Sequence, residues 1–119
     1  MGKKIVLELS EAEAALVQRA CEFYARIRVG QFGEISYYCM DVKDHDYSIR
    51  RQKADELLFE SRKYIFPELH GVGHSYGIGK FEDADIAFDV HQAIRKVLNG
   101  IKPFSMRPLP ICYKKDFGV

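Results

Sequence analysis

The chain has almost no net charge, because its 18 lysine and arginine residues are balanced by 17 aspartate and glutamate residues. Proteins that bind nucleic acid without sequence preference normally carry a concentrated basic face. A formal net charge of +1 supplies no overall field that would attract nucleic acid or an anionic membrane. The balance therefore argues against both as partners.

Long apolar runs and paired cysteines are also lacking. The apolar run from Ile5 to Leu7 is too short for a signal peptide or a membrane span. The three cysteines, Cys21, Cys39 and Cys112, are odd in number and show no Cys-x-x-Cys spacing. Reduced thiols in a cytoplasm are the simplest interpretation, so we expect a cytoplasmic protein.

The length of 119 residues predicts one domain, spanning residues 1–119, with a single core. Ser10 and Glu13 match a capping box, Asp46 and Asp83 are expected helix caps, and Pro67 is expected to end a helix. Together with apolar residues at helical spacing, these signals predict four helices, over about residues 10–28, 31–40, 47–65 and 83–98.

Two strands are also expected. Residues 3–9 alternate, with Ile5, Leu7 and Leu9 on one face, which is typical of a half-buried strand. Prolines make the C-terminal segment extended, so residues 106–113 are expected to form an edge strand. The sequence therefore predicts an α+β fold, in which three to four helices pack on a small antiparallel sheet formed by these two strands.

Glycine is concentrated in one segment. Four of the nine glycines fall between residues 71 and 79. Such a density indicates close backbone approach or positive φ angles. The segment does not match a P-loop, because Phe81 follows Gly79-Lys80 where Ser or Thr is required, and Tyr76 breaks the dinucleotide-binding pattern. A ligand-binding loop and a plain surface connector both remain open.

Six residues around this segment are the candidate ligand-binding set: Tyr76, Lys80, Phe81, His91, Arg95 and Arg107. Phe81 could stack on a base or could anchor the loop to the core. His91 and Arg95 lie one turn apart on a predicted helix and could line a groove, or form a plain amphipathic flank. Arg107 could clamp a phosphate with two donors, or be a solvated arginine.

A catalytic or metal centre is not predicted. His70, His74 and His91 invite a zinc hypothesis, but the first two lie in a glycine-rich loop, whereas zinc prefers rigid ligands. Ser75 beside His74 does not make a triad, because adjacency along a loop does not orient one. The sequence therefore predicts a binding protein that is not an enzyme and uses no metal or cofactor.

Three segments resemble a known family. They are the opening LELSEAEAAL from Leu7 to Leu16 that leads to YARIRVGQFGEI from Tyr24 to Ile35, then DIAFDVHQAIR from Asp85 to Arg95, and MRPLP from Met106 to Pro110. The chain resembles small phage and prophage proteins, the first-described type of phage Thoeris anti-defence protein. The resemblance implies a homo-oligomer built from dimers that holds cyclic ADP-ribose signals, and in some members cyclic oligonucleotides, without cleaving them.

In that family an aromatic residue stacks on adenine, while arginines and polar side chains hold the diphosphate. Judged by their local context, Phe81, His91 and Arg107 are the positions in this chain that best suit these tasks. The resemblance also implies a protein that acts in the cytoplasm of an infected bacterial host. Two other hypotheses stay open: a metal-assisted phosphodiesterase that uses His70, His74 and His91, and a protein-binding inhibitor of a host enzyme. Nucleic-acid binding is disfavoured by the near-neutral charge.

Overall fold

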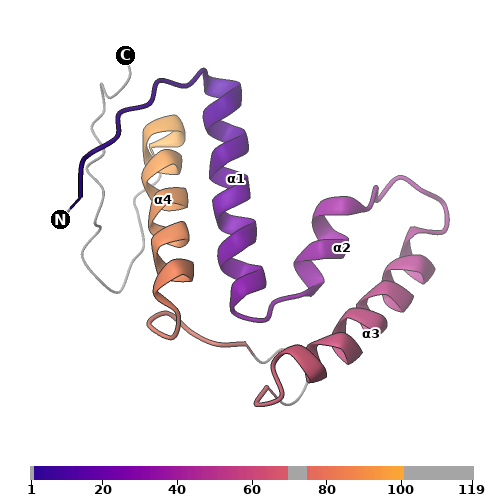
Figure 1. Ribbon diagram of the computed structural model, residues 1–119. Coiled ribbons are helices and arrows are strands. Elements are labelled where there is room, and N and C mark those ends of the chain that lie inside the picture. The colour runs from indigo at the N-terminus through magenta and orange to yellow at the C-terminus, as the bar shows by residue number, and fades with distance from the viewer. Residues whose placement is uncertain (1, 70–74, 101–119) are drawn as a thin grey trace. The chain divides into compact units, whose positions relative to one another are not determined.

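The computed structural model describes residues 2–69 and 75–100, and four helices account for most of them (Figure 1). These helices are α1 (Glu11–Arg28), α2 (Gly33–Cys39), α3 (Tyr47–Ile65) and α4 (Glu82–Asn99). The expected positions of all four helices are confirmed to within a few residues. In α3 the expected and observed bounds coincide.

The expected α+β class is wrong, because no residue in the described ranges belongs to a strand. Residues 2–9 carry no regular structure, and Ile5, Val6 and Leu7 are 89%, 77% and 62% exposed. Alternating apolar residues form a strand only when a neighbouring strand pairs with the backbone. The expected partner, residues 106–113, lies outside the described residues. As described, the fold is all-helical.

The chain divides into two compact units, and the boundaries fall inside α1 and α4. The first unit contains residues 2–22 and 86–100, and the second contains residues 23–85. In the first, the early turns of α1 run antiparallel to the later turns of α4 (Figure 1). In the second, α2 packs against α3, where the Ser36 hydroxyl lies 2.5 Å from Oδ1 of Asp55.

Local signals explain where the helices begin and end. The capping box at the start of α1 is confirmed: the amide of Ser10 donates to Glu13 at 2.9 Å, and the amide of Glu13 donates to the Ser10 hydroxyl at 3.1 Å. Helix α3 ends two residues before Pro67, as expected. Asp46 precedes α3 but makes no capping bond, because its carboxylate pairs with Arg50 at 3.4 Å.

Polar side chains make up an unusual share of the buried residues. In the first unit Asp89, His91 and Gln92 are at most 2% exposed, beside the buried Ala93. Burying such groups costs free energy unless hydrogen bonds replace water. The side-chain amide of Gln18 forms a hydrogen bond with Nδ1 of His91, which replaces water for one of these groups.

Candidate functional site

Tyr76, Lys80 and Phe81, three of the six predicted ligand-binding residues, lie together in the second unit. The rings of Tyr76 and Phe81 meet edge to face, with centroids 5.2 Å apart. The ammonium group of Lys80 lies 5.1 Å from the Tyr76 centroid and 5.8 Å from the Phe81 centroid. The centroid of the Phe66 ring lies 5.5 Å from that of Tyr76 and 6.3 Å from that of Phe81. We call Tyr76, Lys80, Phe81 and Phe66 the aromatic cluster.

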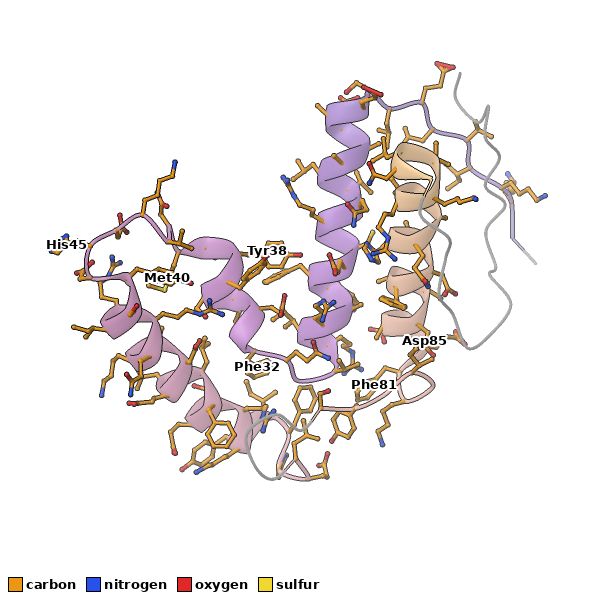
Figure 2. The ribbon with its side chains drawn as sticks, turned by 180° about the vertical axis from the view of Figure 1, so that it is seen from behind. Phe32, Tyr38, Met40, His45, Phe81 and Asp85 are labelled. Carbon is orange, nitrogen blue, oxygen red and sulfur yellow. The ribbon has the colours of Figure 1, made fainter. Side chains whose placement is uncertain are left out.

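Backbone contacts position the loop that carries the cluster. The amide of Tyr76 donates to the carbonyl of Val29 at 2.9 Å, just after α1. The amide of Gly79 donates to both carboxylate oxygens of Asp85, at 3.1 and 3.2 Å. Gly79 has a φ angle of +98°, which side-chain-bearing residues rarely adopt. Figure 2 shows Phe81 at the end of this loop, close to Asp85 in the first turn of α4.

Arg28, at the end of α1, contacts the aromatic cluster, and the sequence alone did not predict this contact. Its guanidinium carbon lies 3.7 Å from the Phe81 ring centroid, in stacking geometry. An arginine at the end of a helix is sufficiently explained by its attraction to the negative end of that helix. A usable signal was present, because Tyr24 lies four residues before Arg28 and thus shares its helix face.

Asp83 connects Arg28 and Tyr24. Its Oδ2 accepts hydrogen bonds from the Tyr24 hydroxyl at 2.6 Å and from Nε of Arg28 at 3.1 Å. The bond from Tyr24, followed by the bond and charge of Arg28, lowers the pKa of the Asp83 carboxyl below its usual value. The same bond raises the pKa of Tyr24. The expected capping role of Asp83 is wrong, because α4 already begins at Glu82.

His91 and Arg95 belong to the first unit. His91 is 2% exposed and contacts α1: besides the bond from Gln18, its Nε2 lies 4.0 Å from a carboxylate oxygen of Glu22. Arg95 is half-buried, and its Nε has no hydrogen-bond partner within the described ranges. Arg107 lies outside the described residues, so its predicted role stays a prediction.

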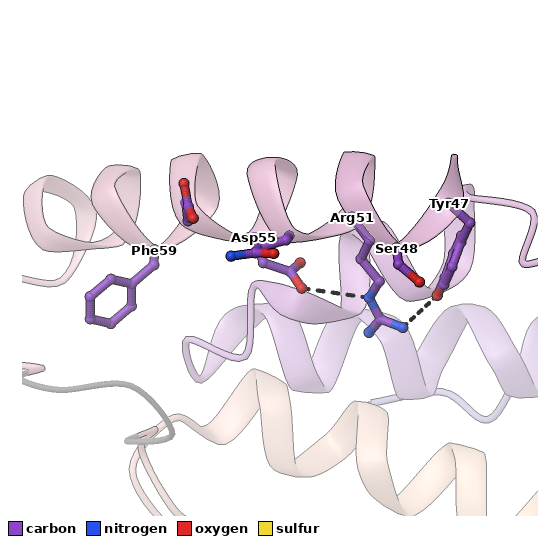
Figure 3. Close-up of a pocket in the computed structure, with 7 residues that line it drawn as sticks. Tyr47, Ser48, Arg51, Asp55 and Phe59 are labelled. Atoms are coloured by element: carbon purple, nitrogen blue, oxygen red, sulfur yellow. Dashed lines mark hydrogen bonds and ion pairs between the residues drawn. The ribbon is translucent and has the colours of Figure 1, made fainter. Parts of the chain in front are cut away.

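Two grooves lie elsewhere in the second unit. The larger, of about 570 Å³, follows one side of α3 (Figure 3). Arg51 places a guanidinium in this groove. Its Nη1 donates to the Tyr47 hydroxyl at 2.6 Å, and its Nε lies 3.5 Å from Oδ2 of Asp55, so neighbours on the same helix hold it. The smaller groove, of about 410 Å³, includes Arg62. Neither contains a predicted ligand-binding residue, and we favour the aromatic cluster because it combines rings with exposed cations.

The described part of the chain contains neither a cluster of metal-ligating side chains nor a helix that could span a membrane. Within it, no three His, Cys, Asp or Glu residues group in a way that could hold a metal ion. His70 and His74, which the zinc hypothesis requires, fall outside the described residues. No described helix combines the length and apolarity needed to cross a bilayer.

Comparisons with known proteins return no relative: no protein-family model, curated protein sequence or solved structure matches this chain.

Proposed function

We propose that this protein binds a cyclic nucleotide signal, of the cyclic ADP-ribose type, at the aromatic cluster and holds it without cleaving it. The observation that carries the proposal is the set of contacts at Phe81, which has a guanidinium at 3.7 Å, an ammonium at 5.8 Å and two neighbouring rings. Rings and cations of this kind suit a ligand that combines a base with phosphates.

The cationic and phenolic groups of the cluster support sequestration rather than turnover. Lysine and arginine keep their protons at neutral pH and serve as donors, not as bases. The hydroxyl of Tyr76 donates to Glu68, and this bond raises the pKa of Tyr76 further above neutrality. Such groups can bind and orient a ligand, and they supply no nucleophile or general base. As a protein of phage origin, it would remove host immune signals of the Thoeris type in the bacterial cytoplasm.

Calorimetry with the cyclic ADP-ribose isomers tests the proposal. Loss of a stacking ring costs about 1–3 kcal/mol, so Phe81→Leu is expected to weaken binding by about 5- to 150-fold. Phe59→Leu is the matched control, because Phe59 is also half-buried beside two cations, Arg62 at 5.0 Å and Lys63 at 5.4 Å, but stands outside the cluster. Equal losses in both variants would contradict the assigned site.

The fate of the bound molecule separates binding from catalysis. Heat denaturation of the loaded protein followed by mass spectrometry is expected to return intact ligand. A hydrolysed product would favour the phosphodiesterase hypothesis with His70, His74 and His91. In that case stoichiometric zinc or manganese, and turnover lost on chelation, would identify a metal-assisted enzyme.

A protein-binding function is the second candidate, and exposed apolar side chains on α3 favour it. Ile49, Leu57, Tyr64 and Ile65 are 57–85% exposed. Apolar surface of this kind commonly marks a contact with another protein. The partner is either another copy, in the dimer-based homo-oligomer that we propose, or a host enzyme. Light scattering of the purified protein and of Leu57→Lys distinguishes them, because only self-association changes the mass of the protein alone.

A further inference from the structure

We propose that the Asp83 carboxylate occupies the place of a ligand phosphate on Arg28, and that binding exchanges the one anion for the other. This inference rests on the proposed function and adds to it. It identifies an internal competitor that sets how strongly a phosphate must bind. All the residues involved lie in the second unit.

Arg28 can offer a phosphate the same kind of donors that it offers Asp83. A guanidinium has five N–H groups in a planar fork, and the fork matches carboxylate and phosphate equally well. Among the residues that the structure describes, Asp83 is the one carboxylate in an ion pair with Arg28, through Nε at 3.1 Å. The Arg28 side chain is 36% exposed, so an incoming anion can reach it.

The Phe81 ring lies beneath the guanidinium of Arg28. Because the Arg28 guanidinium carbon lies 3.7 Å from the Phe81 centroid, the guanidinium covers one face of the ring. A base can stack on that face only if Arg28 moves aside, or it can stack on the guanidinium itself. Stacking on the outer face of the guanidinium leaves the in-plane hydrogen bond from Nε to Asp83 in place. A base can therefore bind without releasing Asp83, and it is the phosphate that competes with Asp83 for Arg28.

Asp83 keeps favourable surroundings after its release from Arg28. Its side chain is 48% exposed, so water can solvate the carboxylate. The Tyr24 hydroxyl, 2.6 Å away, remains as a donor on a different side chain. The displaced carboxylate thus stays solvated and keeps a hydrogen bond, so the exchange costs little free energy. A ligand without phosphate has nothing to offer Arg28 in return, which favours phosphate-bearing ligands over nucleosides.

Calorimetry on three variants tests the exchange, with the cyclic ADP-ribose isomers as probes. Asp83→Asn keeps the size of the side chain and an oxygen for Tyr24 but removes the competing charge. An exposed ion pair of this kind predicts about 2- to 5-fold tighter binding. Arg28→Lys removes the fork and is expected to weaken binding by about 10-fold or more. Adenosine is expected to bind Asp83→Asn and the unmodified protein alike.

Glu82→Gln is the matched control, because it removes the same charge one residue away. Glu82 is exposed and makes no hydrogen bond or ion pair among residues 2–69 and 75–100. If Glu82→Gln tightens binding as much as Asp83→Asn, the effect is a general change of charge and the exchange is refuted. Unchanged or weaker binding by Asp83→Asn would also overturn it, because Asp83 would then support the site instead of competing for it.

A second readout separates failure of this inference from failure of the proposed function. Nuclear magnetic resonance can follow the Nε–H signal of Arg28 while inorganic pyrophosphate is added. The signal is expected to shift at lower pyrophosphate concentration in Asp83→Asn than in the unmodified protein. This result is expected even if no cyclic ADP-ribose isomer binds, which would refute the proposed function alone. Identical titration curves would refute the exchange, whatever the cyclic ligands do.

Discussion

Replacing Gly30 by alanine is expected to destabilise the second unit, for two separable reasons. Gly30 lies between α1 and α2 with a φ angle of +98°, and its carbonyl accepts a hydrogen bond from Nη1 of the buried Arg62 at 3.3 Å. A Cβ atom added there would lie 2.6 Å from Cδ1 of Leu69, closer than real Cβ contacts. The substitution therefore strains the backbone and crowds a neighbouring side chain.

The magnitude is the sum of these two effects. A left-handed conformation costs an alanine about 1–2 kcal/mol. Overpacking costs about 1–3 kcal/mol, and the lower half of that range applies because Leu69 contributes the end of a flexible side chain. Gly30→Ala is thus expected to lower the free energy of unfolding by about 2–4 kcal/mol, a large part of the stability of a small domain.

Two other glycines provide matched controls. Gly79 has the same φ angle of +98°, but a Cβ atom there would meet nothing within 4 Å, so Gly79→Ala is expected to cost only the backbone share, about 1–2 kcal/mol. Gly77 has open space and no left-handed φ, so Gly77→Ala is expected to be neutral or slightly stabilising.

Urea unfolding followed by circular dichroism at the helical signal measures all three variants. The expected order of destabilisation is Gly30→Ala, then Gly79→Ala, then Gly77→Ala. Equal free energies of unfolding for the first two variants would refute the contact with Leu69. A neutral Gly79→Ala would refute the assigned backbone conformation.

Three further predictions concern other contacts. Ser10→Ala removes half of the capping box and is expected to cost about 1 kcal/mol in urea unfolding, whereas a neutral result would mean that α1 does not depend on this cap. Gln18→Leu and His91→Leu are each expected to be destabilising, and the double variant less so than their sum, by about 0.5–3 kcal/mol; strict additivity would contradict their hydrogen bond. The pKa of Asp83 is lowered by folding, so its contribution is complete above its unfolded-state pKa of about 4 and is lost as the pH falls through the folded-state value. Between pH 6 and pH 3, Asp83→Asn should therefore lose less stability than the unmodified protein, and equal losses would argue against the pair with Arg28.

Helices could be predicted from this sequence because their signals are local. Ser10 and Glu13 lie three positions apart, and Pro67 acts on the residue before it, so no distant contact is needed. The strand expected at residues 3–9 was a different case. Its alternation shows only that one face is apolar, whereas a strand also needs a partner backbone.

The candidate site could be predicted only where its members are close in sequence. Tyr76, Lys80 and Phe81 fall within six positions, and their grouping could be expected from composition. Arg28 could not be placed there, because 55 positions separate it from the Asp83 that holds it. His91 illustrates a second limit. Helical spacing located it at the border of the apolar face, but could not indicate that Gln18 would cover it.

The buried Asp89, His91 and Gln92 of the first unit and the half-buried Gln18, which we call the polar layer, affect how its two helices align. Contacts between apolar side chains allow one helix to slide along the other, because one apolar surface resembles the next. The hydrogen bond between Gln18 and His91, next to Asp89 and Gln92, does not allow such sliding. A slide of one helical turn, 5.4 Å, would leave these groups desolvated opposite the wrong neighbours. The layer thus selects a single alignment of α1 and α4 from those that packing alone would permit.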